Sequence, residues 1–211
     1  MQIVCYAAPP SGLGEAVITA IIGTDNSERT LVPTLAALVS GATAGVLREV
    51  IVADAGSADA TADVADMAGC DLLVAKAPLA QRLRQAAERA RAPWLLFLRP
   101  GVALDASWIE ETTRFMEQAQ FSGRPDARAA VFRPAPSVVD ARPLLFEALA
   151  MLKTALGGRP RPEQGLLIFK RLYDSLGGHR EVVDAEADLL ARLGRKRTVM
   201  LRSGAVKVID A

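Results

Sequence analysis

The sequence predicts a single α/β domain built on a doubly wound, mostly parallel β-sheet, and three observations predict this fold class. The chain has 211 residues, which suits one domain of ordinary size with a substantial core. Over the first two-thirds, short runs rich in Val and Ile alternate with Ala-rich helical stretches. The runs are continuously apolar, as strands covered on both faces are. Repeated strand–helix–strand units imply parallel strands joined by right-handed crossovers.

The first half of the chain contains four expected strands and four expected helices. The strands are the apolar runs Ala16–Ile22, Arg48–Ala53, Asp71–Ala75 and Trp94–Leu98. The helices follow them, at Thr30–Ser40, Ala58–Ala68, Leu79–Ala90 and Ala106–Gln118. Ser57 stands where the N-cap of the second helix belongs. Pro33 falls in the first turn of its helix, where a missing N–H costs little.

The pattern changes beyond about residue 120, where strands and helices no longer alternate regularly. The expected strands are Ala129–Phe132, Gly165–Phe169 and Arg197–Leu201. The expected helices are Pro143–Leu156, a short one ending at Gly177-Gly178, and Asp184–Leu193. Gly157–Pro162 is too rich in Gly and Pro for a helix or a central strand. We therefore expect one domain over residues 1–211, with a first half over about 16–120 and a mixed-direction second half over about 121–205.

Composition and charge narrow the class of protein. Hydrophobic residues make up 51% and charged residues 23%, which is typical of a soluble globular chain. The net charge of +1 argues against nucleic acid as a partner. Two cysteines make no disulfide framework, and neither a signal peptide nor an apolar span of about 20 residues is present, so we expect a cytoplasmic protein without a transmembrane segment. His179 is the only histidine, and a triad or a His-based metal site would have to rest on it alone.

Basic residues gather near the C-terminus, with no acid until Asp210. They are Arg195, Lys196, Arg197, Arg202 and Lys207. The ordinary interpretation is a solvated surface strand and turn. The alternative is a peripheral contact of this basic tail with acidic lipid headgroups or with a phosphorylated acceptor.

The loops that follow the expected strands contain the candidate binding residues, because ligands of open α/β sheets bind at the carboxyl ends of strands. These loops are Gly23–Leu31, Asp54–Thr61 and Arg99–Gly101. An Asp at a strand end, followed by a glycine turn, can receive a base or a ribose by hydrogen bonding. The alternative is that Asp54 and Asp59 only cap the following helix.

Four segments, taken together and in this order, carry a resemblance to a known family. Ile18–Asn26 looks like a strand usually written V-I-I-P-T-Y-N, and Ile51–Thr61 is similar to V-V-D-x-G-S-x-D-x-T. Glu163–Gly165 followed by Leu172–Gly178 looks like an acceptor-side strand with its L-G-G turn, and Glu186–Gly194 resembles E-D-x-D-L-x-x-R. The set resembles the inverting family 2 glycosyltransferases over roughly residues 16 to 205. The resemblance implies the GT-A fold, a single Rossmann-like domain that binds a nucleoside diphosphate-sugar.

The resemblance also implies roles for particular residues. Asp54 would contact the nucleobase, with Thr24 and Asn26 lining the same pocket. Glu186 takes the position of the general base that deprotonates the acceptor hydroxyl, and an ionised carboxylate suits that task. The alternative is that Glu186 and Asp188 are only first-turn acids favoured by the helix dipole. The full set of expected substrate-binding positions is Thr24, Asn26, Glu28, Asp54, Gly56, Arg82, Arg99, Gly101, Gln164 and Asp188.

The chain departs from the family pattern at three places. Arg99 and Gly101 stand where the family has the Asp-x-Asp pair that holds a divalent cation, Mg²⁺ or Mn²⁺, against the donor's pyrophosphate, so the usual oxygen ligands of that cation are absent. Ala185 replaces the first acid of the E-D pair. Pro78–Ala87 lacks the family's glycines and an Asn, although Arg82 and Arg84 offer charged donors to phosphate.

We therefore expect an inverting glycosyltransferase that is independent of metal, with a nucleoside diphosphate-sugar as donor and an unidentified acceptor. In this hypothesis the Arg99 guanidinium neutralises the diphosphate in place of the cation. The alternative is a catalytically inactive module of the same fold that binds a nucleotide or a partner protein, with Arg99 an ordinary surface residue. Nucleotidyltransfer and dehydrogenation are disfavoured, because neither L-x-G-G-x-x-x-R nor G-x-G-x-x-G follows the first strand.

Overall fold

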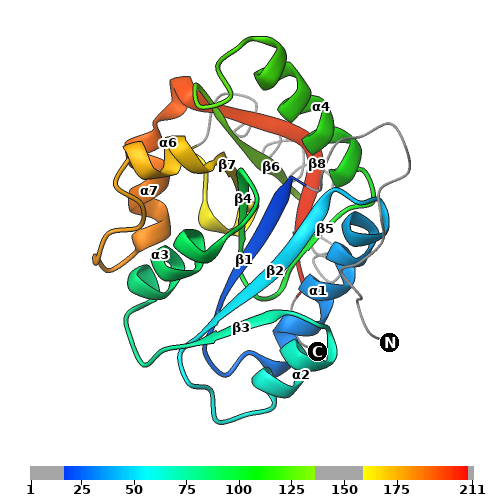
Figure 1. Ribbon diagram of the computed structural model, residues 1–211, viewed down its shortest axis with the longest axis vertical. Helices are drawn as coiled ribbons and strands as arrows, with labels where there is room; N and C mark the ends of the chain where they lie inside the picture. The colour runs from blue at the N-terminus through cyan, green and yellow to red at the C-terminus, as the bar shows by residue number, and fades with distance from the viewer. Residues whose placement is uncertain (1–16, 136–158, 209–211) are drawn as a thin grey trace, which may run out of the picture.

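The computed structural model describes residues 17–135 and 159–208. The described chain forms a mixed eight-stranded sheet in the order β3-β2-β1-β4-β7-β6-β8-β5, with helices on both faces (Figure 1). The predicted α/β fold class is therefore confirmed. The helix expected at Pro143–Leu156 lies outside the described residues, and the organisation of residues 1–211 as one domain stays a prediction.

The first four strands are parallel and form one side of the sheet. β1 (Ile18–Thr24) lies between β2 (Leu47–Asp54) and β4 (Trp94–Leu98), and β3 (Asp71–Val74) pairs with the outer side of β2. All five residues of β4 are buried, as its continuous apolar run predicts. Because these strands run the same way, the loops after β1, β2 and β4 meet at one edge of the sheet.

The other four strands give the sheet its mixed direction. β7 (Leu166–Phe169) is antiparallel to β4 and to β6 (Ala129–Ala135), while β8 (Thr198–Lys207) runs parallel to β6. The edge strand β5 (Val102–Leu104) is antiparallel to β8. The mixed second half was predicted, but β5 was not. Three residues are too few to show a strand period in the sequence.

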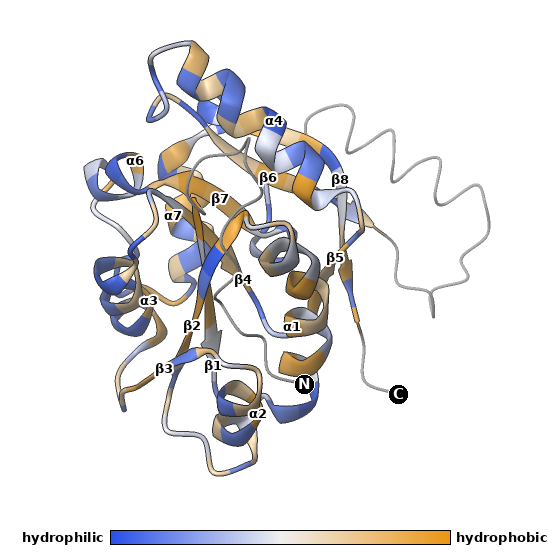
Figure 2. Cartoon of the chain, turned by 45° about the vertical axis from the view of Figure 1, so that its right-hand side comes forward, coloured by the Kyte–Doolittle hydropathy of each residue, from blue (hydrophilic) through white to orange (hydrophobic). Residues whose placement is uncertain are grey.

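Within residues 17–135 and 159–208, three helices cover each face of the sheet. α1 (Glu28–Thr43), α2 (Thr61–Met67) and α4 (Trp108–Phe121) pack on one face. α3 (Leu79–Arg89), α6 (Lys170–Ser175) and α7 (Ala185–Leu193) pack on the other. Two 3₁₀ turns, η1 (Pro162–Gln164) and η2 (Arg195–Arg197), precede β7 and β8. Apolar residues lie on the strands and on the inward sides of the helices (Figure 2).

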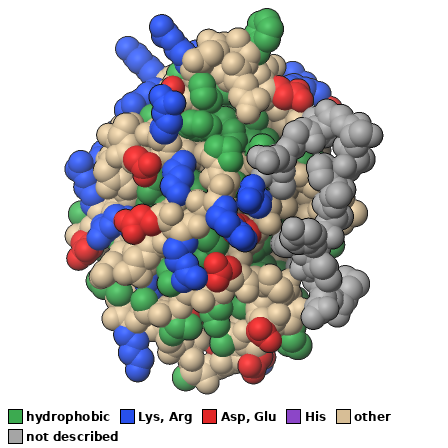
Figure 3. All heavy atoms as spheres, in the orientation of Figure 1, with side chains coloured by type: hydrophobic (Ala, Val, Ile, Leu, Met, Phe, Trp, Pro, Cys, Tyr) green, Lys and Arg blue, Asp and Glu red, His purple; other side chains and the backbone are tan. Residues whose placement is uncertain are grey.

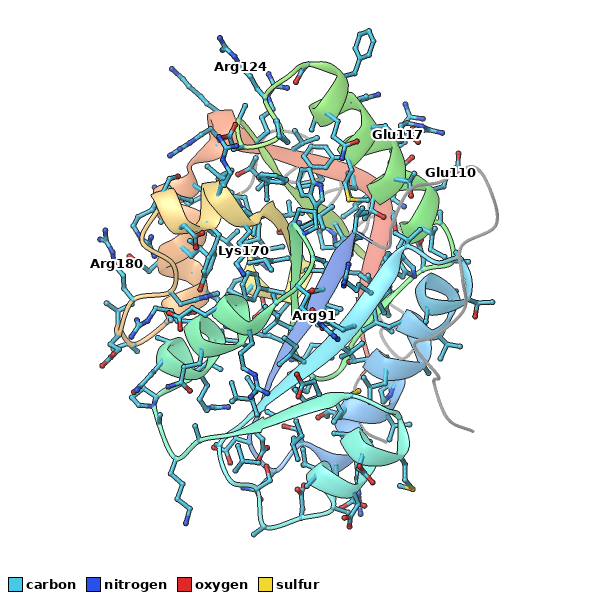
Figure 4. The ribbon with its side chains drawn as sticks, in the orientation of Figure 1. Arg91, Glu110, Glu117, Arg124, Lys170 and Arg180 are labelled. Atoms are coloured by element: carbon cyan, nitrogen blue, oxygen red, sulfur yellow. The ribbon has the colours of Figure 1, made fainter. Side chains whose placement is uncertain are left out.

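The sheet has a hydrophobic core on each face, and successive residues of one strand point alternately into the two cores because the strand is pleated. Ile22 packs in the core under α1, and Ile21 packs in the core under α3. On the second face, Lys170 at the start of α6 reaches the end of α3, and its Nζ donates to the carbonyls of Glu88 (3.1 Å) and Ala90 (2.8 Å) (Figure 4). This contact fixes the helix that precedes the L-G-G turn.

Three local predictions are wrong. Ser57 does not cap α2, because α2 begins at Thr61. Pro33 lies inside α1 and not in its first turn, because α1 already begins at Glu28. Pro162, expected in a loop, opens η1. The start of α1 is set by hydrogen bonds to the opposite loop, which a local cap pattern does not reveal. At the start of α2, Asp59 Oδ1 accepts from the Thr61 N–H (3.0 Å), so Asp59 and not Ser57 takes the capping role.

The basic tail lies on η2 and β8. Figure 3 shows Lys and Arg side chains projecting at the end of the molecule where Figure 1 places η2. Arg197 binds the end of α7, where its guanidinium donates to the carbonyls of Leu193 (3.0 Å) and Arg192 (3.1 Å). Among the helices of residues 17–135 and 159–208, none is long and apolar enough to cross a bilayer. The contact of this tail with lipid headgroups or a phosphorylated acceptor stays a prediction.

Candidate functional site

The loops after β1 and β2 meet at the carboxyl edge of the sheet and are joined by hydrogen bonds. Three backbone N–H groups at the start of α1 donate to the second loop: Asn26 to Ser57 Oγ (2.8 Å), Ser27 to Thr61 Oγ1 (2.8 Å) and Glu28 to Asp59 Oδ2 (3.0 Å). In return, Ala58 N–H donates to Asn26 Oδ1 (2.9 Å) and Ala60 N–H to Glu28 Oε2 (3.4 Å). The amides of a helix start lack partners within their own helix, so the second loop caps α1.

Asn26 is the strained residue of this junction, with φ at +47°. Replacing Asn26 with Ala is expected to lower the free energy of unfolding by about 1–2 kcal/mol, because Ala both resists the left-handed region and leaves the Ala58 N–H without its acceptor. Asn26→Gly relieves the backbone strain alone and is expected to cost less. Urea denaturation of the two variants measures both losses. A larger loss in the Gly variant would contradict this account.

Asp54 ends β2 and is 1% exposed. Its Oδ1 accepts from the hydroxyls of Thr24 (2.8 Å) and Ser57 (2.6 Å), and its Oδ2 accepts from the backbone N–H groups of Gly56 (2.8 Å) and Ser57 (2.7 Å). All four acceptor positions of the carboxylate are therefore filled. Burial favours the neutral acid, but the hydrogen bonds from Ser57, Thr24 and Gly56 outweigh it and hold the pKa of Asp54 below its ordinary value. Asp54 is a fixed anion that holds Thr24 and the Gly56 turn, whose φ is +89°.

Arg82 lies beneath the same edge, on α3, and is 5% exposed. Its Nη1 donates to the Thr24 carbonyl (2.8 Å) and to the Ala53 carbonyl, and its Nε donates to Ala77 (3.1 Å). Burial lowers the pKa of the guanidinium, while Asp54 and Asp25 oppose that shift. Arg82 thus binds the carbonyl ends of β1 and β2 in this structure.

Arg99 follows β4 and lies among three carboxylates. Its Nε donates to Glu186 Oε2 (2.6 Å), its Nη1 to Glu163 Oε1 (2.9 Å), and its Nη2 approaches Asp184 Oδ1 (3.4 Å). One guanidinium among three carboxylates leaves two negative charges unmatched in this cluster. The side chain of Arg99 is 33% exposed, so solvent reaches the cluster. The structure therefore brings together the position expected to bind the diphosphate and the position expected to hold the base.

Glu186 is the most buried member of this cluster, with a side chain that is 12% exposed. Burial raises the pKa of its carboxyl above the ordinary value, and the charge and hydrogen bond of Arg99 only partly oppose the rise. Its Oε2 is held by Arg99. Within the described residues its Oε1 has no hydrogen-bond donor, so that oxygen is available to accept a proton.

The expected metal position offers no ligand set for a divalent cation. Gly101 adopts φ +84°, and its N–H donates to the Thr30 carbonyl (2.8 Å) and to Thr34 Oγ1 (3.0 Å), which presses this turn onto α1. Among residues 17–135 and 159–208, no group of three or more His, Cys, Asp or Glu side chains is arranged to hold a metal ion. A guanidinium and a glycine at the Asp-x-Asp position do not fit Mg²⁺ or Mn²⁺, which bind oxygen ligands.

The side chains of two further expected site residues, Gln164 and Asp188, bind other parts of the chain. Gln164 is 4% exposed; its Nε2 donates to the Phe132 carbonyl (2.7 Å), and its Oε1 accepts from the Arg161 N–H (2.8 Å), which joins η1 to β6. Asp188 forms an ion pair with Arg192 (2.7 Å). Arg192 also donates to the Gly178 carbonyl (2.7 Å), so this pair ties α7 to the L-G-G turn.

Sequence reasoning missed three residues of this region. Glu163 and Asp184 are partners of Arg99. Glu163 stands in a quoted motif and Asp184 caps α7 by accepting from the Ala187 N–H (3.0 Å), but neither pattern names Arg99 as a partner. His179 was noted only as the lone histidine, and the structure places it beside Glu186 in a small pocket.

The sheet order, the two helix layers and the loops at the carboxyl edge together form the GT-A glycosyltransferase fold. Three solved structures show the likeness. S. aureus TarS matches with a TM-score of 0.65 at 16% identity, over 92% of this chain and 37% of that one. TarS 1–349 in complex with UDP matches at 0.63 and 16%, over 90% and 60%. Glucosyl-3-phosphoglycerate synthase of Mycobacterium tuberculosis, in complex with Mn²⁺, UDP and glucosyl-3-phosphoglycerate, matches at 0.61 and 17%, over 93% and 73%.

At these identities the likeness shows the fold alone. The chain spans 37% of the TarS chain and 60% of TarS 1–349, which is less than two-thirds of either. No protein-family profile and no curated protein matches the sequence.

Proposed function

We propose that this chain transfers a sugar from a nucleoside diphosphate-sugar to an acceptor hydroxyl, with inversion and without a divalent cation. One observation carries the proposal. The Arg99 guanidinium, at the position of the family's metal ligands, donates to Glu186, at the position of its base, over 2.6 Å. A cation for the leaving diphosphate and a carboxylate for the acceptor proton therefore lie side by side. TarS 1–349 has been solved with UDP and with UDP-GlcNAc, which supports a nucleotide-sugar as the donor.

The proposed reaction is a single displacement at the anomeric carbon. Glu186 Oε1 takes the proton of the acceptor hydroxyl while the oxygen of that hydroxyl bonds to the anomeric carbon. The bond from that carbon to the diphosphate oxygen breaks, and its electron pair leaves with the diphosphate. Arg99 neutralises the charge that develops there, as a fixed guanidinium can. Because the raised pKa of Glu186 makes the carboxylate a stronger base, burial at this position favours the proton transfer.

The nucleobase is proposed to lie over Thr24, Asn26 and Asp54 at the carboxyl edge. Since the four acceptor positions of Asp54 are filled by the chain itself, its part in this proposal is to hold the Thr24 hydroxyl and the Gly56 turn in place. Glu28 takes part through the hydrogen bonds between the two loops. Arg82 takes part by holding the strand ends.

The second candidate is a catalytically inactive module that binds a nucleotide or a partner protein. The three carboxylates around Arg99 favour this second candidate. As long as Arg99 stays paired with them, the unmatched negative charge of the cluster opposes the binding of a diphosphate. A panel of nucleotide-sugars with and without Mn²⁺, read by thermal shift, separates the candidates, because specific binding raises the melting temperature. We expect a shift with a donor that is unchanged by Mn²⁺ or EDTA, followed by UDP release. A shift without UDP release would support the inactive module, and no shift with any nucleotide would support partner binding.

Arg99 gives the sharpest test of metal independence. Replacing Arg99 with Ala is expected to weaken UDP binding in EDTA at least about tenfold, because a charge-assisted contact to the diphosphate is lost. Calorimetric titration measures the affinity. Arg114→Ala is the matched control, since it removes the same charge from an ion pair with Glu110. Glu110 lies on α4 (Figure 4), and we expect the UDP affinity of this variant to be unchanged. Equal affinities for the protein and its Arg99 variant would remove Arg99 from the proposal.

A further inference from the structure

His179 is a buried imidazole whose surroundings fix its position. It follows Gly178 in the L-G-G turn and is 1% exposed. The turn lies flat on Tyr173, because a Cβ at Gly178 would come within 3.1 Å of the Tyr173 ring, and Gly178 has a φ of +60°. The His179 ring also stands edge-on to Phe97, with 4.8 Å between ring centroids. The Tyr173 ring lies on another side, with 5.5 Å between ring centroids, so two aromatic rings restrict the orientation of the imidazole.

Hydrogen bonds assign the proton of this ring. The Tyr173 hydroxyl accepts from the His179 backbone N–H (3.2 Å) and lies 2.9 Å from Nδ1. Within residues 17–135 and 159–208, Nδ1 is the hydroxyl's only acceptor, so the hydroxyl donates to Nδ1. A neutral imidazole that accepts at Nδ1 carries its proton on Nε2.

The ring also stays neutral. Burial, together with the nearby charges of Arg192 and Arg84, lowers the pKa of His179 to about 3, and Asp188 opposes this only in part. Burial raises the pKa of Tyr173 to about 12, so the phenol keeps its proton as well. The pair therefore presents an unchanging N–H donor at Nε2 across the neutral range.

His179 and Glu186 line the same small pocket, which has room for about one water molecule, some 10 Å³. The rest of the lining is largely apolar and is made by Phe97, Pro162, Gly165, Leu166 and Leu190. Within the described residues, Nε2 of His179 and Oε1 of Glu186 have no hydrogen-bond partner. A residue with a free donor and a residue with a free acceptor thus line one space of the size of a single hydroxyl group.

We propose that His179 is a substrate-positioning residue whose Nε2–H donates a hydrogen bond to the oxygen of the acceptor hydroxyl and turns its proton toward Glu186. This inference rests on the proposed function and extends it to the class of acceptor. A hydroxyl oxygen accepts from Nε2–H with one lone pair, gives its proton to Oε1, and attacks the anomeric carbon with the other lone pair. A protonated amine has no lone pair for Nε2–H. The pocket therefore selects an oxygen nucleophile and takes water in the absence of an acceptor.

The first test needs no substrate. Because the chain has one histidine, the ring nitrogens of a protein purified without a histidine tag give one set of ¹⁵N signals. We expect Nε2 protonated and Nδ1 unprotonated, with both shifts constant from about pH 5 to 8. A ring that titrates in this range, or that carries its proton on Nδ1, would overturn the inference.

The second test uses UDP-sugar hydrolysis, in which water takes the place of the acceptor. His179→Phe is expected to lower the rate of UDP release roughly 10- to 100-fold with UDP affinity unchanged, since a misplaced nucleophile is slow to react. His179→Gln, which returns an N–H donor close to the Nε2 position, is expected to recover part of the rate. If the protein releases UDP and His179→Phe does so equally fast, the inference fails while the proposed function stands. If the protein itself releases none from any donor, the proposed function fails.

Discussion

Replacing Glu186 with Gln is expected to lower the rate of sugar transfer, or of UDP-sugar hydrolysis, by about 10²- to 10⁴-fold, with little change in donor affinity. Glutamine keeps the shape of the side chain but accepts no proton, and a positioned general base typically contributes that much to a rate. Steady-state UDP release at saturating donor measures the loss. Glutamine also keeps an oxygen that accepts from Arg99 Nε, so the position of the guanidinium is retained.

Glu163→Gln is the matched control for this variant. It removes the same charge from the same guanidinium, since Arg99 Nη1 donates to Glu163 over 2.9 Å, but it leaves the proposed base in place. We expect a loss far smaller than that of Glu186→Gln. Equal losses in the two variants would mean that both act through Arg99, and Glu186 would no longer be assigned as the base.

The variant Glu186→Gln should lose activity but lose less melting temperature than the unsubstituted protein as the pH rises. Because burial raises the folded-state pKa of Glu186, this group stabilises the fold below the ordinary Glu range and loses that contribution as the pH rises through its folded pKa. Glu186→Gln has no such loss, so its melting temperature should fall less than that of the unsubstituted protein as the pH rises above about 4.5. A residue that costs stability and supports activity is typical of a functional site.

Most of the fold can be predicted because its elements have a local signal. The runs that form β1, β2 and β4 are apolar, largely buried and separated by helical stretches, so their positions follow from the sequence pattern. β5 has three residues and pairs with β8 about a hundred residues away, and no local pattern reports that pairing. The start of α1 fails for the same reason, since its cap comes from the opposite loop.

In the candidate site, too, the positions of residues can be predicted from sequence, whereas their side-chain partners cannot. A strand end or a helix start can be located from sequence, and the resemblance to the family 2 glycosyltransferases then singled out Arg99 and Glu186. The contact between them joins residues that are 87 positions apart, and it depends on how α7 packs against the end of β4. The pairing of His179 with Tyr173 spans only six residues, yet it requires the turn at Gly178 to fold back on the ring. Side-chain partners of this kind follow from tertiary packing.

Replacing Asp54 with Asn is expected to lower the free energy of unfolding by about 2–4 kcal/mol at neutral pH, because a buried anion that accepts four hydrogen bonds is lost. The amide has one oxygen, which can accept from the rigid N–H groups of Gly56 and Ser57, and its NH₂ must then face the hydroxyls of Thr24 and Ser57. Ser57 Oγ already accepts from the Asn26 N–H, so it has little capacity for another donor. Urea denaturation measures the loss.

The same variant should also change how stability depends on pH. Because the folded-state pKa of Asp54 lies below its ordinary value, its contribution is present above about pH 4 and is lost as the pH falls toward the folded pKa. The unsubstituted protein should therefore lose melting temperature between about pH 5 and 3 more steeply than Asp54→Asn does. Asp66→Asn removes an exposed carboxylate from α2 and should leave both the acid slope and the stability within about 0.5 kcal/mol of the original. If Asp54→Asn keeps the full acid slope, the Asp54 anion does not hold the two loops together, and the direct hydrogen bonds between the loops do so without it.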